Sequence, residues 1–124
     1  MARILVIDDD ATVGMTLTRM LQLDGHVVSR AETAQDGFDQ AAATRPDAII
    51  LDMRMPAMGG LDFLRRLRGL PGLEQLPVGI VTGDYFLDEQ IIGELGALGA
   101  HIRYKPVWMD ELSALMRALL EARA

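Results

Sequence analysis

The sequence predicts an α/β domain in which a five-stranded parallel sheet carries helices on both of its faces. Stretches of strand character alternate with stretches of helical periodicity along all 124 residues, which is the pattern of repeated βα units. The run Ala48–Leu51 is apolar throughout, as expected for a strand that is buried on both sides. This run and Ile4–Ile7 both lead directly into aspartates. In such sheets ligands bind beyond the carboxyl ends of the strands, so we expect the functional site there.

Local patterns predict each element in turn. Strands are expected at residues 3–7, 27–29, 48–51, 78–81 and 101–104. Apolar residues at helical spacing predict helices at 12–23, 34–44, 61–67, 87–98 and around 112–120. Gly25 follows the first helix, Pro46 follows the second, and a Gly-Leu-Pro-Gly stretch ends the third. No repeat or linker interrupts the pattern, so residues 1–124 are expected to form a single domain.

Composition excludes several classes of protein. Half of the residues are apolar, but no window approaches the ~18 uninterrupted apolar residues that indicate a membrane span. The chain has no cysteine, which rules out a disulfide framework or a thiolate metal site. Met1 leads straight into the first strand-like run and leaves no room for a signal peptide. We therefore expect a cytoplasmic protein that does not engage a membrane.

The charge pattern argues against direct nucleic-acid binding. The net charge is −6, whereas a nucleic-acid surface usually needs a clustered basic face. Arg65, Arg66 and Arg68 form the only basic cluster, and we expect it to be a solvated helix face. The chain's only lysine is Lys105, which suggests a position where a compact ammonium is needed.

Several polar residues fall at the carboxyl ends of the predicted strands: Asp8, Asp9, Asp52, Thr82 and Lys105. Carboxylates that lie close together raise one another's pKa or recruit a cation. Mg²⁺ takes oxygen ligands and keeps several waters, so one or two carboxylates suffice to hold it. The metal positions a phosphate for in-line attack, while a lysine and a hydroxyl bind the remaining oxygens. The set predicts Mg²⁺-dependent phosphorylation of an aspartate. Asp10 is expected only to begin the following helix.

Four motifs, "ILVIDDD", "IILDMRMPAMGG", "IVTG" and "YKP", occur in this order and resemble the receiver domain of bacterial response regulators in two-component systems. The resemblance covers essentially the whole chain. It implies a (βα)5 flavodoxin-like receiver fold and a phosphorelay function in signal transduction. The domain would be a regulatory phosphoacceptor, catalysing only its own phosphoryl transfer and dephosphorylation. The expected donor is a sensor histidine kinase or a phosphotransfer protein. The expected target is an output domain or partner protein, with a homodimer possible on activation.

The resemblance also implies roles for individual residues. Asp52 would be the phosphoacceptor. Asp9, Asp52 and the backbone carbonyl of Arg54 would bind Mg²⁺ directly, and Asp8 would act through water. Thr82 would bind a phosphoryl oxygen and shift on activation. Lys105 would pair with the phosphate, and its peptide bond to Pro106 is expected to be cis.

The sequence departs from the family pattern around the last strand. The segment from Gly99 to Lys105 is one residue short, and Ile102 stands where an aromatic residue is usual. Tyr104 shares a strand face with Ile102 because side chains alternate. Tyr104 therefore either replaces the switch aromatic or packs beneath the final helix. Gly59 also stands where an Asp or Asn often precedes the loop glycine.

Two residues are expected to overhang the pocket. Arg54 lies two positions past Asp52, and Asp84 lies two positions past Thr82. In the family these positions influence how readily water reaches the acyl phosphate. We hypothesise that Arg54 and Asp84 form an ion pair across the pocket mouth and slow hydrolysis.

Two alternative functions stay open. Asp8-x-Asp10 after an apolar strand also resembles haloacid-dehalogenase-type phosphatases, with Asp8 as nucleophile and Asp10 as general acid/base. That alternative lacks an acidic pair after Lys105 and leaves Asp52 without a role. The other alternative is a degenerate receiver that serves only in protein interactions.

Overall fold

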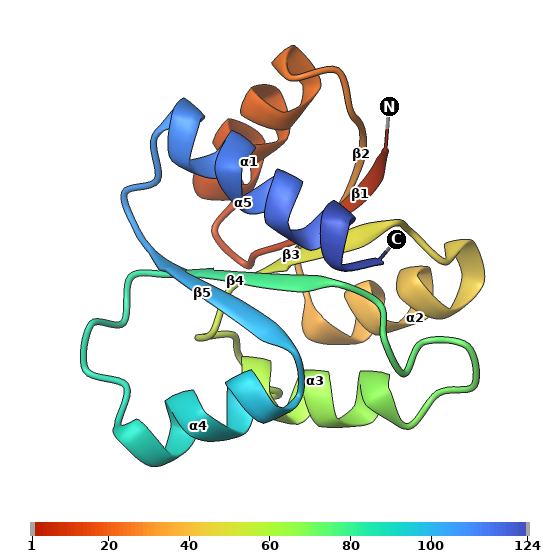
Figure 1. Ribbon diagram of the computed structural model, residues 1–124, viewed down its shortest axis with the longest axis vertical. Coiled ribbons are helices and arrows are strands. Elements are labelled where there is room, and N and C mark those ends of the chain that lie inside the picture. Colours follow the sequence, from red (N-terminus) through yellow and green to blue (C-terminus); the bar gives the residue numbers. More distant parts are fainter. Residues whose placement is uncertain (1, 124) are drawn as a thin grey trace.

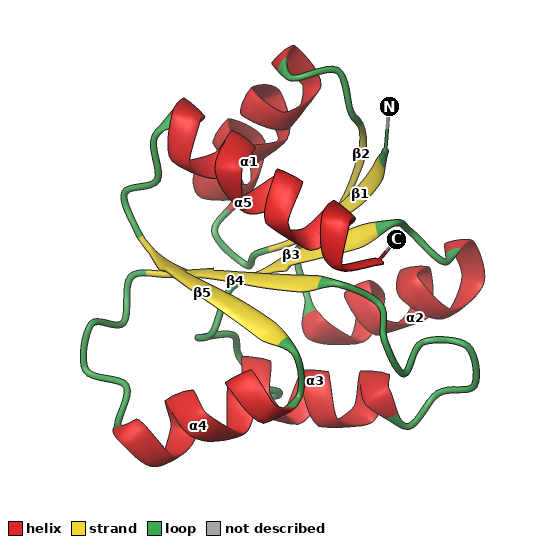
Figure 2. Cartoon of the chain, in the orientation of Figure 1, coloured by secondary structure: helices red, strands yellow, loops and turns green. Residues whose placement is uncertain are grey.

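The computed structural model describes residues 2–123 and contains one parallel sheet in the order β2-β1-β3-β4-β5 (Figure 2). The strands are β1 Arg3–Ile7, β2 Val27–Ala31, β3 Ala48–Leu51, β4 Val78–Thr82 and β5 Ala100–Tyr104. After β2 the chain crosses back to β3, so β1 and β3 are neighbours and the strand order reverses between them. This reversal is the topological switch point at which ligands bind in doubly wound sheets. The fold class expected from the sequence is confirmed.

Helices cover both faces of the sheet (Figure 1). The helices are α1 Ala11–Leu23, α2 Ala34–Thr44, α3 Gly60–Arg68, α4 Glu89–Ala97 and α5 Met109–Arg123. Helices α1 and α5 pack on one face, and α2, α3 and α4 pack on the other. Alternate residues of each strand serve the two cores, so that Ile50 packs with the α1/α5 layer while Ile49 and Leu51 pack with the opposite layer. All four residues of β3 are buried, as the apolar run predicts.

Element boundaries differ from the sequence prediction where capping or pairing decides them. Strand β2 continues to Ala31 because Arg30 and Ala31 pair with the end of β1. Helix α1 begins at Ala11, and the Asp10 carboxylate caps it by accepting hydrogen bonds from the Thr12 and Val13 N–H groups of its first turn. Helix α4 begins at Glu89, later than expected, because Asp88 is its N-cap and accepts from the Ile91 N–H at 2.8 Å.

The arginine cluster on α3 is not uniformly solvated, so the expectation was wrong for Arg68. Its guanidinium is half-buried and donates to three backbone carbonyls, those of Leu98 at 2.8 Å, Leu73 at 3.2 Å and Leu76 at 2.7 Å. Arg68 therefore joins α3, the loop before β4 and the end of α4. Burial lowers its pKa. Arg65 instead forms exposed ion pairs with Asp62 and Glu94. No helix in the described part of the chain is long and apolar enough to cross a bilayer.

Candidate functional site

The parallel register brings the acidic residues together. Ile7 of β1 is paired with Leu51 of β3, so the next residues, Asp8 and Asp52, emerge side by side at the carboxyl edge of the sheet. The backbone fixes this position, since the Asp52 N–H donates to the Ile7 carbonyl at 3.0 Å. Asp8, Asp9 and Asp52 each offer a carboxylate oxygen, and these oxygens all lie within 4.8 Å of one another. Asp8 and Asp52 are buried, and Asp9 is exposed.

Lys105 supplies the positive charge of this cluster. Its Nζ lies 3.0 Å from Asp8 Oδ2 and 3.4 Å from Asp52 Oδ1. The ammonium reaches this position from the end of β5, which is separated from β3 only by β4. Its backbone is anchored to β4, because the Lys105 N–H donates to the Thr82 carbonyl at 2.8 Å. The peptide bond to Pro106 is cis, as expected.

Burial and charge shift the pKa values of this pair. Burial raises the pKa of Asp52, Lys105 partly offsets the rise, and the neighbouring Asp8 charge adds to it. Burial alone would lower the pKa of Lys105, but its hydrogen bond to Asp8 and the charges of Asp52 and Asp8 raise it overall. The ammonium is therefore held protonated, and the Asp52 carboxylate is more basic than an exposed aspartate. A basic, poorly hydrated carboxylate is a suitable nucleophile.

Thr82 and two rim residues complete the cleft, whose lining is Asp8, Asp9, Asp10, Asp52, Arg54, Thr82, Gly83, Asp84 and Lys105. The buried Thr82 hydroxyl accepts a hydrogen bond from the Asp84 N–H at 3.1 Å, which leaves its own proton free to be donated into the cleft. The Arg54 guanidinium binds the Asp84 carboxylate, with Nε 2.6 Å from Oδ2. The pKa of Asp84 is lowered by the hydrogen bond from the Phe86 N–H and by Arg54.

The described residues suit a hard divalent cation. Three carboxylates lie beside the single ammonium of Lys105, so the cluster carries excess negative charge in a partly buried place. All the donors are oxygens, which is the ligand class that Mg²⁺ prefers. A cation of this kind would relieve the repulsion between the carboxylates. Asp10 lines the same cleft, but its Oδ1 accepts both hydrogen bonds that cap α1.

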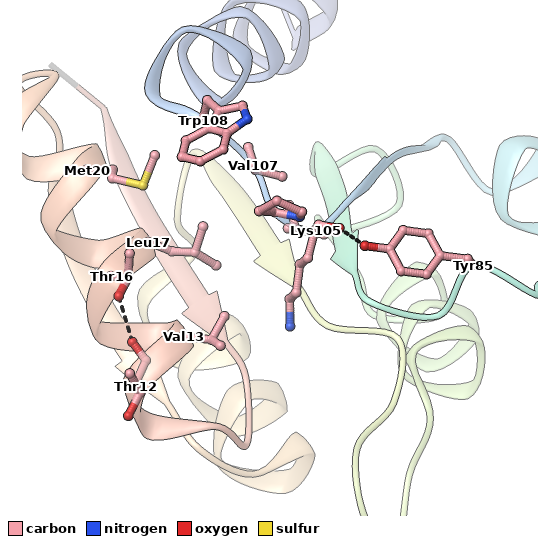
Figure 3. A pocket seen from close by; sticks show the side chains of 11 residues that line it. Thr12, Val13, Thr16, Leu17, Met20, Tyr85, Lys105, Val107 and Trp108 are labelled. Carbon is pink, nitrogen blue, oxygen red and sulfur yellow. Dashed lines mark hydrogen bonds between the residues drawn. The ribbon is translucent and has the colours of Figure 1, made fainter.

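The aromatic residues near the site adopt an arrangement that the sequence did not reveal. Tyr104 stacks on Tyr85 of the β4–α4 loop, with ring centroids 5.7 Å apart and an interplanar angle of 25°. Tyr104 lies on the strand face of Ile102, which packs with the α2, α3 and α4 layer, so it is not beneath α5. The Tyr85 hydroxyl donates to the backbone carbonyl of Lys105 (Figure 3). In the sequence, the only indication of the bond between Tyr85 and Lys105 was the presence of an aromatic residue three positions past Thr82.

An apolar pocket of about 480 Å³ adjoins the acidic cleft. It lies between α1 and the segment from Lys105 to Trp108, and Figure 3 shows Leu17 and Met20 on one side and Trp108 on the other. Trp108 is exposed over about two thirds of its surface (66%). Lys105 lines both the pocket and the cleft.

The raised pKa of Asp52 makes a prediction about stability. A carboxyl whose pKa is higher in the folded state destabilises the fold when ionised. The penalty is absent below its ordinary pKa of 3.8 and complete above its folded pKa. We expect Asp52→Asn to raise the free energy of unfolding at pH 7.5 and to lose this advantage at about pH 3, below the ordinary pKa of the carboxyl, as measured by urea denaturation. Asp62→Asn on the exposed face of α3 is the control and should change stability by less than about 0.5 kcal/mol at either pH. A less stable Asp52→Asn variant at pH 7.5 would contradict the pKa assignment.

Comparisons with known proteins agree with this architecture. The family model described as "Response regulator receiver domain" matches residues 4–117. The response regulator MprA of Mycobacterium tuberculosis (strain ATCC 25177 / H37Ra) is 40% identical over 118 residues, covering 95% of this chain and 50% of the relative. MprA of Mycolicibacterium vanbaalenii is 39% identical over 118 residues, again covering 95% of this chain and 50% of the relative. The chain thus spans about half the length of these curated relatives.

Solved structures show the same fold. A response regulator receiver domain protein from Clostridium thermocellum superposes with a TM-score of 0.89 at 30% identity, covering 99% of this chain and 97% of that one. The chemotaxis protein CheY4 of Vibrio cholerae has a TM-score of 0.88 at 26% identity, with coverage of 97% and 99%. With the family match spanning nearly all of the sheet and its acidic edge, this chain belongs to the response regulator receiver domain family of two-component systems.

Proposed function

We propose that this chain accepts a phosphoryl group on Asp52 from a phosphohistidine of a partner protein, in a Mg²⁺-dependent reaction. The observation that carries the proposal is the convergence of Asp8, Asp9 and Asp52 on one point, with the Lys105 ammonium bound to two of them. Three carboxylates that converge beside a single ammonium leave like charge unrelieved, which is energetically costly unless a cation binds there.

The residues divide the chemistry among themselves. A carboxylate oxygen of Asp52 attacks phosphorus, the P–N bond to the donor imidazole breaks, and an acyl phosphate forms. Asp9, Asp52 and the Arg54 carbonyl would hold Mg²⁺, with Asp8 acting through water. Bound there, the ion supplies charge neutralisation and in-line positioning of the phosphoryl oxygens. Lys105 exchanges a carboxylate partner for a phosphoryl oxygen, and Thr82 donates its hydroxyl to another. The proton from Thr82 is available because its oxygen already accepts from Asp84.

The partners follow from this chemistry as part of the proposal. The donor is a sensor histidine kinase or a phosphotransfer protein, and the recipient of the signal is an output domain or a separate protein. We propose further that the domain acts in the cytoplasm and catalyses only its own phosphorylation and dephosphorylation. Any longer protein that contains this chain would be controlled through the phosphorylation state of Asp52. A homodimer on activation and a switch role for Tyr104 stay predictions.

Acetyl phosphate tests the proposed acceptor directly. We expect incubation with Mg²⁺ and acetyl phosphate to add one phosphoryl group, and peptide mass spectrometry to place it on Asp52. Asp52→Asn should remove this label, and omission of Mg²⁺ should prevent it. Asp10→Asn is the matched control, since Asp10 caps α1, and it should keep the label.

The same experiment separates the alternative functions. Steady release of phosphate through Asp8, with Asp10→Asn inactive, would instead support the phosphatase alternative. The absence of any label, together with no Mg²⁺-dependent binding of beryllofluoride, would support a degenerate receiver.

The Arg54–Asp84 pair leads to a kinetic prediction. Arg54 is 73% exposed and reaches over the cleft to the Asp84 carboxylate, so the pair covers the approach of water to Asp52. The Asp84 side chain is only 11% exposed, but Arg54 stays largely in contact with water, so the pair adds under ~1 kcal/mol of stability and its main effect is steric. We expect Arg54→Ala to shorten the lifetime of the phosphorylated protein several-fold, measured by loss of label after donor removal. Arg54→Lys keeps a charge and a long side chain, so the lifetime of its phosphorylated form should lie between those of the wild type and Arg54→Ala. An unchanged lifetime in Arg54→Ala would remove the pair from the mechanism.

A further inference from the structure

We propose that Tyr85 is a positioning residue for Lys105, holding its backbone so that the ammonium reaches the phosphoryl site. This inference rests on the proposed function, because it concerns the same lysine. Tyr85 belongs to the β4–α4 loop, three residues beyond Thr82, and is 58% exposed as a residue. An exposed tyrosine ordinarily moves freely between rotamers. This side chain makes two directed contacts, which together fix where it lies.

The first contact is polar. The Tyr85 hydroxyl donates to the Lys105 backbone carbonyl, and Figure 3 shows the ring pointing at that carbonyl. The Lys105 N–H donates to the Thr82 carbonyl at 2.8 Å. Both backbone groups of Lys105 are therefore bonded to the same segment, β4 and the loop that follows it. The next residue, Pro106, has no N–H and cannot add a bond of its own. Without Tyr85 the carbonyl side of Lys105 would lack this anchor.

The second contact is apolar. Tyr85 stacks on Tyr104, the residue before Lys105, at a centroid distance of 5.7 Å and an angle of 25°. Offset stacking of two rings restricts both side chains and favours a single loop position. Tyr104 is paired with Thr82 in the sheet, so the stack lies directly beside the strand ends that carry the site. The two contacts together form a bracket, Tyr85–Tyr104–Lys105, that joins the loop to the end of β5.

The bracket matters because Lys105 acts through a long side chain. The Nζ atom is 3.0 Å from Asp8 and 3.4 Å from Asp52, so it sits at the limit of direct contact with the acceptor. A lysine is a point charge on a flexible stem, and its position depends on where its backbone is held. Loosening the carbonyl side of Lys105 therefore weakens its hold on a phosphoryl oxygen. The carboxylates proposed to hold the metal follow β1 and β3, and the two contacts of Tyr85 described above do not involve them.

Beryllofluoride, a phosphoryl mimic, provides the test. Its affinity in the presence of Mg²⁺ is measured by titration calorimetry, alongside Mg²⁺ affinity alone. We expect Tyr85→Phe, which keeps the ring and removes the hydroxyl, to bind beryllofluoride about 2- to 10-fold more weakly, the range for loss of one hydrogen bond. Its Mg²⁺ affinity should not fall. Tyr104→Phe keeps the stacked ring and the Tyr85 hydroxyl, so it should match the wild type. Phe86→Leu, at an exposed position in the same loop, should match it as well.

The outcomes distinguish this inference from the proposed function. If the wild type fails to bind beryllofluoride with Mg²⁺, the proposed function itself is wrong and the inference falls with it. If the wild type binds and Tyr85→Phe binds equally well, only the positioning role is overturned. Equal losses of beryllofluoride and Mg²⁺ affinity in Tyr85→Phe would also overturn it, since that result indicates general disruption of the site. Tyr104→Leu, which removes the stack, should weaken beryllofluoride binding and leave Mg²⁺ binding intact.

Discussion

The site depends on one electrostatic arrangement, the Lys105 ammonium between the buried carboxylates of Asp8 and Asp52. The parallel pairing of β1 with β3 forces these carboxylates together at the switch point of the sheet. Lys105 offsets only part of the resulting charge, because Asp9 adds a third carboxylate within 4.8 Å. The fold thus holds a cluster that is under-neutralised by the protein alone. In the proposed function, a divalent cation and a phosphoryl group of opposite charge would complete it together.

The surroundings of this cluster connect it to the surface. Thr82 receives a hydrogen bond from the β4–α4 loop, and Lys105 is tied to the same loop through Tyr85. A change at Asp52 that draws Thr82 and Lys105 toward a phosphoryl group must therefore act on this loop from two sides. The loop leads into α4, and its exposed residue Phe86 follows Tyr85 directly in the chain. Under the proposed function, the path from site to surface would run through Tyr85 of this loop, while Ile102 of β5 occupies the position where the resemblance implies an aromatic residue.

Local patterns predicted most of the fold and the core of the site. Helical spacing and apolar runs depend on neighbours along the chain, and the parallel topology then brings the strand ends, and with them Asp8 and Asp52, to one edge. Features that depend on distant segments were not predictable. Arg68 looked like a solvated residue because its carbonyl partners lie on the loop before β4 and at the end of α4. The Tyr85 bond to Lys105 joins residues 20 positions apart, and only the folded loop brings them together.

The central claim is that the acidic cluster binds a divalent cation. The most direct test measures the free energy of unfolding as a function of MgCl₂ concentration. A ligand that binds only the folded state adds stability as its concentration exceeds Kd, about 2.7 kcal/mol at 100 times Kd. We expect the wild type to gain stability with MgCl₂ well beyond its response to NaCl of equal ionic strength. Asp9→Asn, which removes an exposed carboxylate from the cluster, should lose most of this gain. Equal responses to the two salts in the wild type, or an undiminished gain in Asp9→Asn, would contradict the claim.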